Sequence, residues 1–140
     1  MTDTSSRSES ELEPLDESAI VYRALLRRQW IDETSDLVLL FAYLLRANEP
    51  GLSVTIASVR SPEQCAAKFI NCYGVASIQV GQIRELGLDA VPDSASHAQI
   101  VGLPYVIDDR DRAERLADLL SCSAFKLSVK KQSNSCGVGF

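Results

Sequence analysis

The chain has 140 residues, of which 46% are hydrophobic and 24% are charged, with seven glycines and five prolines. This composition excludes a collagen-like chain, a coiled coil and a wholly disordered polymer, because each needs a bias in glycine, heptad residues or charge that is missing here. A folded part of roughly 110 residues buries enough surface to form one core without a metal or disulfides. We therefore expect no cofactor for stability.

The net charge of −5 is concentrated at the N-terminus. Residues 1–17 carry six acids and one base, whereas residues 18–140 carry thirteen of each. A neutral body lacks the positive surface that phosphate neutralisation requires, so dedicated nucleic-acid binding is not expected. The short basic clusters, Arg27-Arg28 and Lys126 with Lys130 and Lys131, are interpreted as solvated surface.

The first residues have neither the basic nor the apolar segment of a signal peptide. The longest apolar stretch, Leu37 to Leu45, has nine residues, about half of what a membrane span needs. These features predict a cytoplasmic protein without a membrane span. Its four cysteines are then expected to be reduced thiols.

Residues 1–17 are predicted to be a flexible acidic arm, 18–125 a compact domain and 126–140 a flexible tail. The alternation that begins at Ala19 predicts a first strand. The apolar run Leu37 to Arg46 permits helix or strand. We favour a strand, because the turn sequence Asn48-Glu49-Pro50-Gly51 and an alternating segment, 52–59, follow it and predict a hairpin.

Helix signals appear next. Ser61-Pro62-Glu63-Gln64 predicts a capped helix start, and the apolar spacing extends that helix to a C-cap at Gly74. The segments that follow are read as a strand over 75–80, a helical turn over 82–88, an extended piece over 88–93, a last strand over 97–104 and a helix from Asp108 or Asp109 to about Ala124, whose apolar stripe is Ala113, Leu116, Ala117, Leu120 and Ala124. This order predicts an α+β fold: a small single-domain sandwich in which a mostly antiparallel sheet of about five strands packs with two helices.

Few residues of the sequence are candidates for metal binding or catalysis. One histidine and four scattered cysteines do not form a metal set. Cys65 and Cys72 are predicted to share a helix face as small core residues. Nucleophile-elbow and phosphate-loop motifs are absent from the sequence.

A possible cleft involves Arg23, Ser53 and His97. Arg23 lies inside an apolar strand, where it either points to solvent on the outer face, the interpretation we favour, or pairs with an anion. In the second case Arg23, Ser53 and His97 would form an anion-binding cleft at the sheet. His97 is either a structural strand-start residue, which we favour, or a proton-transfer group.

Three segments, Gly51-Leu-Ser-Val, Cys72-Tyr-Gly-Val-Ala-Ser-Ile-Gln-Val-Gly-Gln-Ile-Arg-Glu-Leu-Gly-Leu-Asp-Ala-Val-Pro-Asp93 and His97-Ala-Gln-Ile-Val-Gly-Leu-Pro104, carry a resemblance. Over residues 19–124 the chain resembles a group of short bacterial proteins, chiefly of photosynthetic bacteria, that have no assigned activity. This resemblance implies one compact domain and supplies no mechanism.

Arg23 in Val-Tyr-Arg-Ala and Ser53 in Gly-Leu-Ser-Val also resemble a pair in ADP-ribosyltransferase-like toxins, including the small kind found in toxin–antitoxin pairs. In that family, a first-strand arginine and a later strand serine help to seat NAD. The chain departs from the family pattern because no glutamate completes the set: Glu63 lies in a helix cap and Glu85 in a turn.

The sequence thus favours a non-catalytic accessory or regulatory module that binds another protein. Trp30, Phe41 and Tyr105 are candidates for its contact surface. The alternative is a small NAD-consuming enzyme of the ADP-ribosyltransferase-like type. The enzyme predicts a cleft that joins Arg23, Ser53 and His97, whereas the module predicts an apolar patch or an open sheet edge.

Overall fold

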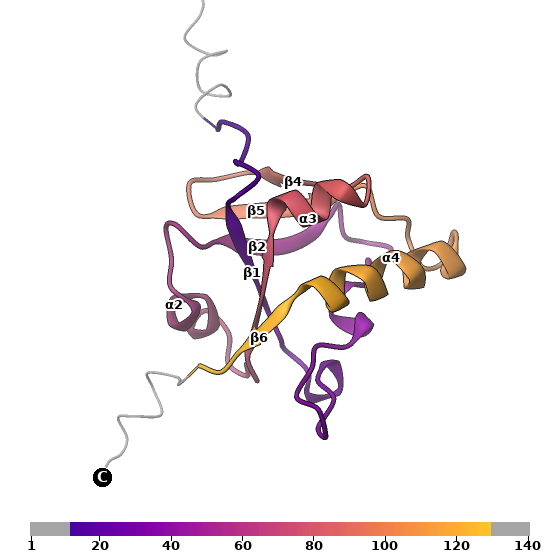
Figure 1. Ribbon diagram of the computed structural model, residues 1–140, viewed down its shortest axis with the longest axis horizontal. Coiled ribbons are helices and arrows are strands. Elements are labelled where there is room, and N and C mark those ends of the chain that lie inside the picture. The colour runs from indigo at the N-terminus through magenta and orange to yellow at the C-terminus, as the bar shows by residue number, and fades with distance from the viewer. Residues whose placement is uncertain (1–11, 130–140) are drawn as a thin grey trace, which may run out of the picture.

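The computed structural model describes residues 12–129, which form a single α+β domain (Figure 1). Six antiparallel strands make one sheet in the order β4-β5-β2-β1-β3-β6. The expected fold class is confirmed, with one more strand and one more α-helix than expected. The strands are β1 (Ile20–Ala24), β2 (Leu52–Ile56), β3 (Val75–Gln79), β4 (Asp89–Pro92), β5 (His97–Val101) and β6 (Phe125–Leu127); the helices are α2 (Pro62–Ala67), α3 (Val80–Glu85) and α4 (Arg110–Ser123), with 3-10 turns η1 (Arg28–Trp30) and η2 (Leu40–Tyr43).

The sheet divides into two halves that are joined only through β1 and β2. Strand β1 pairs with β3 along its whole length, from Ile20↔Gln79 to Ala24↔Val75. Its pairing with β2 covers only Val21↔Ile56 and Tyr22↔Thr55. Figure 1 shows that β4, β5 and β2 run in a clearly different direction from β1, β3 and β6. Beyond Tyr22 the two central strands therefore separate and leave a fork in the sheet.

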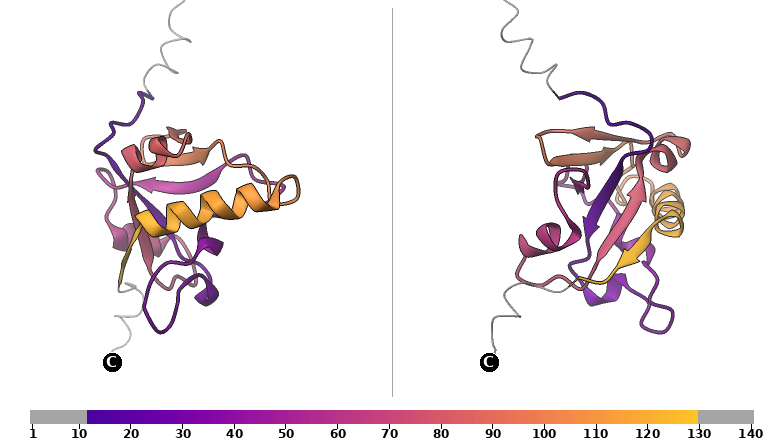
Figure 2. Two further views of the ribbon diagram at one scale, coloured as in Figure 1. Left: turned by 45° about the vertical axis from the view of Figure 1, so that its right-hand side comes forward. Right: turned by 60° about the vertical axis from the view of Figure 1, so that its left-hand side comes forward.

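The two faces of the sheet carry different helices. Helix α4 and η2 bury their apolar residues, among them Leu116, Leu120 and Tyr43, against the main core. Helix α2 forms a smaller cluster on the other face, where Cys65 and Ala66 pack with Ala24 and Val75. The right-hand view of Figure 2 shows α2 and α4 on opposite sides of the strands. The fork thus lies between two packed layers.

Several local predictions are confirmed. Ser61 accepts a hydrogen bond from the Gln64 amide, and the Gln64 side chain accepts one from the Ser61 amide, so a capping box begins α2. Asp109 caps α4, and the α4 stripe is buried at Ala113, Leu116, Ala117 and Leu120. Strand β5 begins at His97 as expected.

The predicted strand over residues 37–46 is wrong. This segment forms η2 instead, with a single bridge between Ile31 and Val38. Both edges of β2 are occupied, by β1 and by β5, so the expected hairpin partner has no free edge to pair with. The apolar run instead buries Ala42 and Tyr43 in the core.

The predicted end of the first helix is also wrong. Helix α2 stops at Ala67, because the next residues bury little apolar surface: Ile70 is 91% exposed. Cys72 therefore lies outside the helix and does not share a helix face with Cys65, although Cys65 is buried as expected. Gly74 is not a helix C-cap; its carbonyl accepts from the amide of Leu25 after β1 ends.

Strand β6 was not expected, since residues from 126 onward were assigned to a tail and 97–104 to the last strand. Residues Phe125 to Leu127 pair with β3, from Ser77↔Phe125 to Val75↔Leu127. Three residues are too few to give an alternation signal in sequence. The arm and tail predictions for residues 1–11 and 130–140 fall outside the described residues.

Candidate functional site

A cavity of about 640 Å³ opens at the fork of the sheet. We call it the fork cavity. It lies within the size range of small-molecule sites. Its walls come from β1, η1, β2, α2 and β5 and from the turn before β2; the lining residues are Tyr22, Arg23, Ala24, Leu26, Arg27, Trp30, Leu44, Arg46, Glu49, Ser53, Val54, Thr55, Cys65, Lys68, Phe69 and His97.

Arg23 lies in the fork rather than on a solvated outer face. Its Nε donates to the carbonyl oxygen of Ala42 at 2.7 Å, and its Nη1 donates to the carbonyl oxygen of Ser53 at 2.9 Å. The guanidinium also lies over the Trp30 ring, 5.6 Å from its centroid. Arg23 thus bridges η2 and β2 where β1 no longer pairs with β2.

Burial has the largest effect on the pKa of Arg23. It lowers the pKa of Arg23, while the nearby Tyr43 and Glu49 act in the opposite direction. An arginine guanidinium keeps its proton in proteins. The fork therefore carries a fixed positive charge.

Ser53 and His97 both line the same cavity as Arg23. The link from Arg23 to Ser53 runs through the Ser53 backbone carbonyl. The Ser53 side chain is exposed and alternates with the buried Leu52 and Val54, so it faces away from the main core. Arg23, Ser53 and His97, the three residues of the less favoured interpretation of the sequence, thus line one cavity.

The fork cavity is rich in positive charge. Four cations line it, Arg23, Arg27, Arg46 and Lys68, against a single carboxylate, Glu49. The body as a whole has equal numbers of acids and bases. This local excess of positive charge, beside the aromatic rings of Trp30 and Phe69, suits an anionic ligand that carries a planar ring.

Glu49 lines the fork cavity, although it was not predicted from the sequence as a site residue. Its Oε1 accepts from the Arg46 amide at 3.1 Å, and its carbonyl accepts from the Tyr105 hydroxyl at 2.9 Å. These bonds fix the turn before β2, and the half-buried Glu49 lines the cavity. The turn sequence Asn48-Glu49-Pro50-Gly51 marked the position as loop, and loops often carry functional groups.

Neither the Cys65 thiol nor the carboxylates of Glu63 and Glu85 adds a reactive group to the fork cavity. Burial raises the pKa of the Cys65 thiol, and a hydrogen bond with Thr55 only partly offsets this effect; a buried, protonated thiol is a poor nucleophile. Glu63 and Glu85 do not line the fork cavity. Among residues 12–129, no three His, Cys, Asp or Glu side chains gather closely enough to hold a metal ion.

A second, more apolar cavity of about 550 Å³ adjoins the first. It shares Arg27, Trp30, Leu44 and Arg46 with the fork cavity and adds Phe41, which is 50% exposed, and Ile107, which is 80% exposed. Of the three aromatic candidates, only Phe41 is exposed; Trp30 is buried and Tyr105 is half-buried.

Comparison of the chain with protein-family models, with curated proteins and with solved structures found no match. None of the helices in residues 12–129 has the length and apolar character that crossing a bilayer requires. The function is therefore argued from the fork cavity itself.

Proposed function

We propose that this protein binds NAD in the fork cavity and cleaves the bond between nicotinamide and ribose. The observation that carries the proposal is the convergence of Arg23, Ser53 and His97 on one cavity of ligand size. Arg23 and Ser53 are the two positions at which the chain resembles ADP-ribosyltransferase-like toxins. Their meeting in one cavity favours the enzyme over a module that lacks a site.

The charges of the cavity suit the pyrophosphate of a dinucleotide. Arg46 and Lys68 are exposed cations on two different walls, and Arg23 lies between the strands. Arginine and lysine are the residues that hold phosphate in most sites. Phe69, which also lines the cavity, contributes apolar ring surface for the nicotinamide or the adenine.

Glu49 supplies the carboxylate that neither Glu63 nor Glu85 provides. When nicotinamide leaves, positive charge develops on the ribose ring. A carboxylate that is already oriented at the cavity wall stabilises this charge without reorganisation. Glu49 is held in this way by the Arg46 amide.

Fluorescence gives a direct test of binding, because Trp30 is the single tryptophan of the chain and lines the cavity. NAD is expected to change the Trp30 emission in a saturable way, with excitation at the red edge of the tryptophan band to limit absorption by the nucleotide. Arg46→Ala and Lys68→Ala should each weaken the binding by roughly five-fold, as expected for the loss of about 1 kcal/mol. Arg110→Ala, an exposed arginine of α4 outside the cavity, is the matched control.

Turnover is tested by measuring free nicotinamide after incubation of the purified chain with NAD. We expect release by the wild type, loss in Arg23→Ala and Glu49→Gln, and no change in Arg110→Ala. Circular dichroism of each variant separates lost activity from lost folding. A folded wild type that neither binds NAD nor releases nicotinamide contradicts the proposal.

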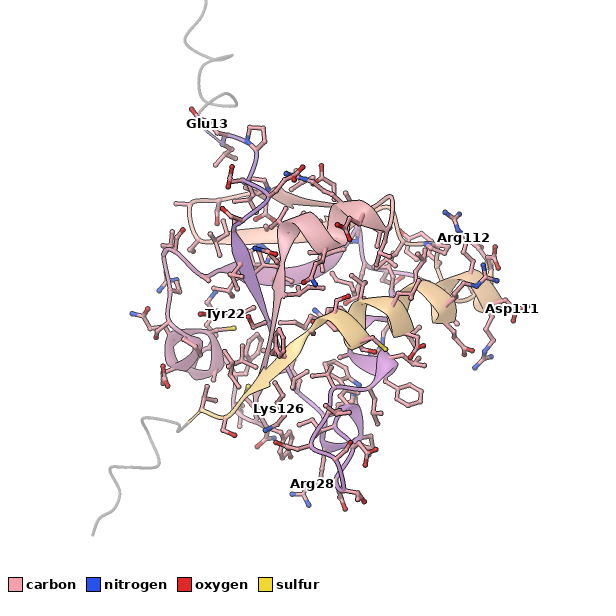
Figure 3. All side chains as sticks on the ribbon, viewed as in Figure 1. Glu13, Tyr22, Arg28, Asp111, Arg112 and Lys126 are labelled. Atoms are coloured by element: carbon pink, nitrogen blue, oxygen red, sulfur yellow. The ribbon has the colours of Figure 1, made fainter. Side chains whose placement is uncertain are left out.

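A second candidate function, protein binding, is favoured by the apolar cavity next to the fork. Exposed Phe41 and Ile107 border it, and Arg27 and Arg46 flank it, which suits an apolar segment with acidic neighbours. Arg28 follows Arg27 in the chain, and Figure 3 shows it at the opposite end of the molecule from Glu13. Pulldown with wild type and Phe41→Ser tests this function; recovery of the same proteins with both variants would count against it.

A further inference from the structure

The Asp93 carboxylate holds the His97 imidazole at the wall of the fork cavity, and the Gln99 amide holds that carboxylate. Nδ1 of His97 lies 2.7 Å from Oδ1 of Asp93, and the other Asp93 oxygen accepts from Nε2 of Gln99 at 3.3 Å. The three side chains therefore form a chain of contacts, Gln99 to Asp93 to His97. Such a chain fixes both the ring orientation and the tautomer of a histidine.

The backbone around this chain of contacts is also fixed. The amides of Asp93 and Ser94 both donate to the carbonyl oxygen of His97 and so close the turn between β4 and β5. His97 pairs with Thr55 of β2, and Thr55 pairs in turn with Tyr22 of β1. His97 thus stands in a row across three strands whose members all line the fork cavity.

We infer that His97 is the general base of the fork cavity and that water is the acceptor of the reaction. This inference rests on the proposed function. A carboxylate that accepts from the Nδ1 proton leaves the Nε2 lone pair available to take a proton. Asp93 and Gln99 are positioning residues, because they act on the reaction through His97.

The step balances as a hydrolysis. The oxygen of a water molecule bonds to the ribose carbon that carried nicotinamide, and the carbon–nitrogen bond breaks. Its electron pair stays with the nicotinamide nitrogen, which loses its positive charge. The water proton passes to Nε2 of His97 and then to solvent, so the products are ADP-ribose, nicotinamide and one proton.

A histidine base also explains why a hydrogen-bonded Asp93–His97 pair lies beside the cavity, which anion binding alone does not require. Binding an anion needs only the cations of the cavity, and a hydrogen-bonded Asp–His pair adds little positive charge to them. A base beside the cavity matters when the acceptor must lose a proton. Water is such an acceptor, and a reaction with water does not require a second protein to bind at the site.

The variant His97→Asn provides the sharpest test. The Asn amide can still donate to Asp93 from about the position of Nδ1, but it leaves nothing in place of Nε2. We expect NAD affinity, read from Trp30 fluorescence, to stay within about three-fold of the wild type, and nicotinamide release to fall at least about 100-fold, the usual size of a general-base contribution. Ala95→Ser, at the exposed tip of the same hairpin, is the matched control and should leave both unchanged.

Rescue distinguishes chemistry from structure. His97→Ala removes the ring, and added imidazole should restore part of its nicotinamide release in proportion to the imidazole concentration. Asp93→Asn should lower kcat about ten-fold or more with little change in KM, since it disturbs the orientation of His97 and not the ligand contacts. ADP-ribose should form in the same amount as nicotinamide without any added protein acceptor.

The outcomes separate the two claims. If the wild type releases nicotinamide and His97→Asn releases it equally fast, the general-base inference is wrong and the proposed function stands. If the wild type transfers ADP-ribose to a protein and forms no free ADP-ribose, water is not the acceptor. If the wild type releases no nicotinamide, the proposed function is wrong and this inference fails with it.

Discussion

The Nη1 atom of Arg23 donates to the carbonyl oxygen of Ser53 across the point where β1 and β2 separate, at 2.9 Å. This bond takes the place of strand pairing, which ends at Tyr22↔Thr55. Because the bond connects the two halves of the sheet, Arg23 has a structural role in addition to its proposed contact with an anion. The structural role is measured by stability, and the proposed contact by NAD binding and turnover.

Arg23→Lys is expected to lower the free energy of unfolding by about 1–3 kcal/mol, because a lysine cannot satisfy the carbonyl oxygens of Ala42 and Ser53 with the same fork of donors. Urea unfolding followed by circular dichroism measures this change. Arg110→Lys, on the exposed face of α4, should be neutral. A loss below about 0.5 kcal/mol for Arg23→Lys, within the range of ordinary surface substitutions, would argue against the bridging role.

Ser61→Ala is expected to destabilise the protein by about 1 kcal/mol, since it removes the capping box of α2. Helix α2 and the residues after it supply Cys65 and Lys68 to the fork cavity. Its fraying should therefore also speed the reaction of Cys65 with a thiol reagent. Ser58→Ala, at an exposed serine just before the helix, is the control; equal effects from both variants would contradict the capping role.

Tyr43→Phe is expected to leave stability unchanged or raise it by up to about 1 kcal/mol. The Tyr43 hydroxyl is buried and finds no hydrogen-bond partner among residues 12–129, so its removal ends a desolvation cost. Thermal unfolding at neutral pH measures the effect. A clear destabilisation would mean that the hydroxyl makes a stabilising contact.

The same substitution should alter the response to alkali. Burial raises the pKa of Tyr43 above its ordinary value. The folded state then keeps the proton that the unfolded chain loses above a pH of about 10, so stability is full below that pH and falls above it. The free energy of unfolding of Tyr43→Phe should therefore fall less steeply between pH 10 and 11 than that of the wild type.

The thiols are expected to differ in reactivity. Cys122 is exposed, whereas Cys65 is buried and burial raises its pKa. In the folded protein at pH 8, alkylation of Cys65 should be slower than that of Cys122 by roughly ten-fold or more, because both access and thiolate fraction are reduced. Peptide mapping by mass spectrometry separates the sites. Equal alkylation rates for Cys65 and Cys122 in the folded protein would contradict the burial of Cys65.

The elements that could be predicted correctly are those whose signals lie close together in the chain. The capping box at Ser61, the Asp109 cap and apolar stripe of α4, and the strand start at His97 each depend on residues within a few positions of one another. Such signals depend on hydrogen bonds and side-chain spacing between neighbours in the chain, so they do not change with the positions of distant elements. The apolar run at residues 37–46 failed as a predictor, because helix and strand both tolerate it and only the occupied edges of β2 decided against a strand.

The fork cavity depends on contacts between residues that are far apart in the chain. Arg23 and Ser53 are thirty residues apart in the chain, and His97 reaches the same wall by pairing with β2. Whether an arginine in an apolar strand points to water or into a gap depends on where distant strands separate. Glu49 belongs to the site for the same reason. The sequence predicted its turn, but the fold places that turn at the cavity, where the Glu49 carbonyl accepts from the Tyr105 hydroxyl.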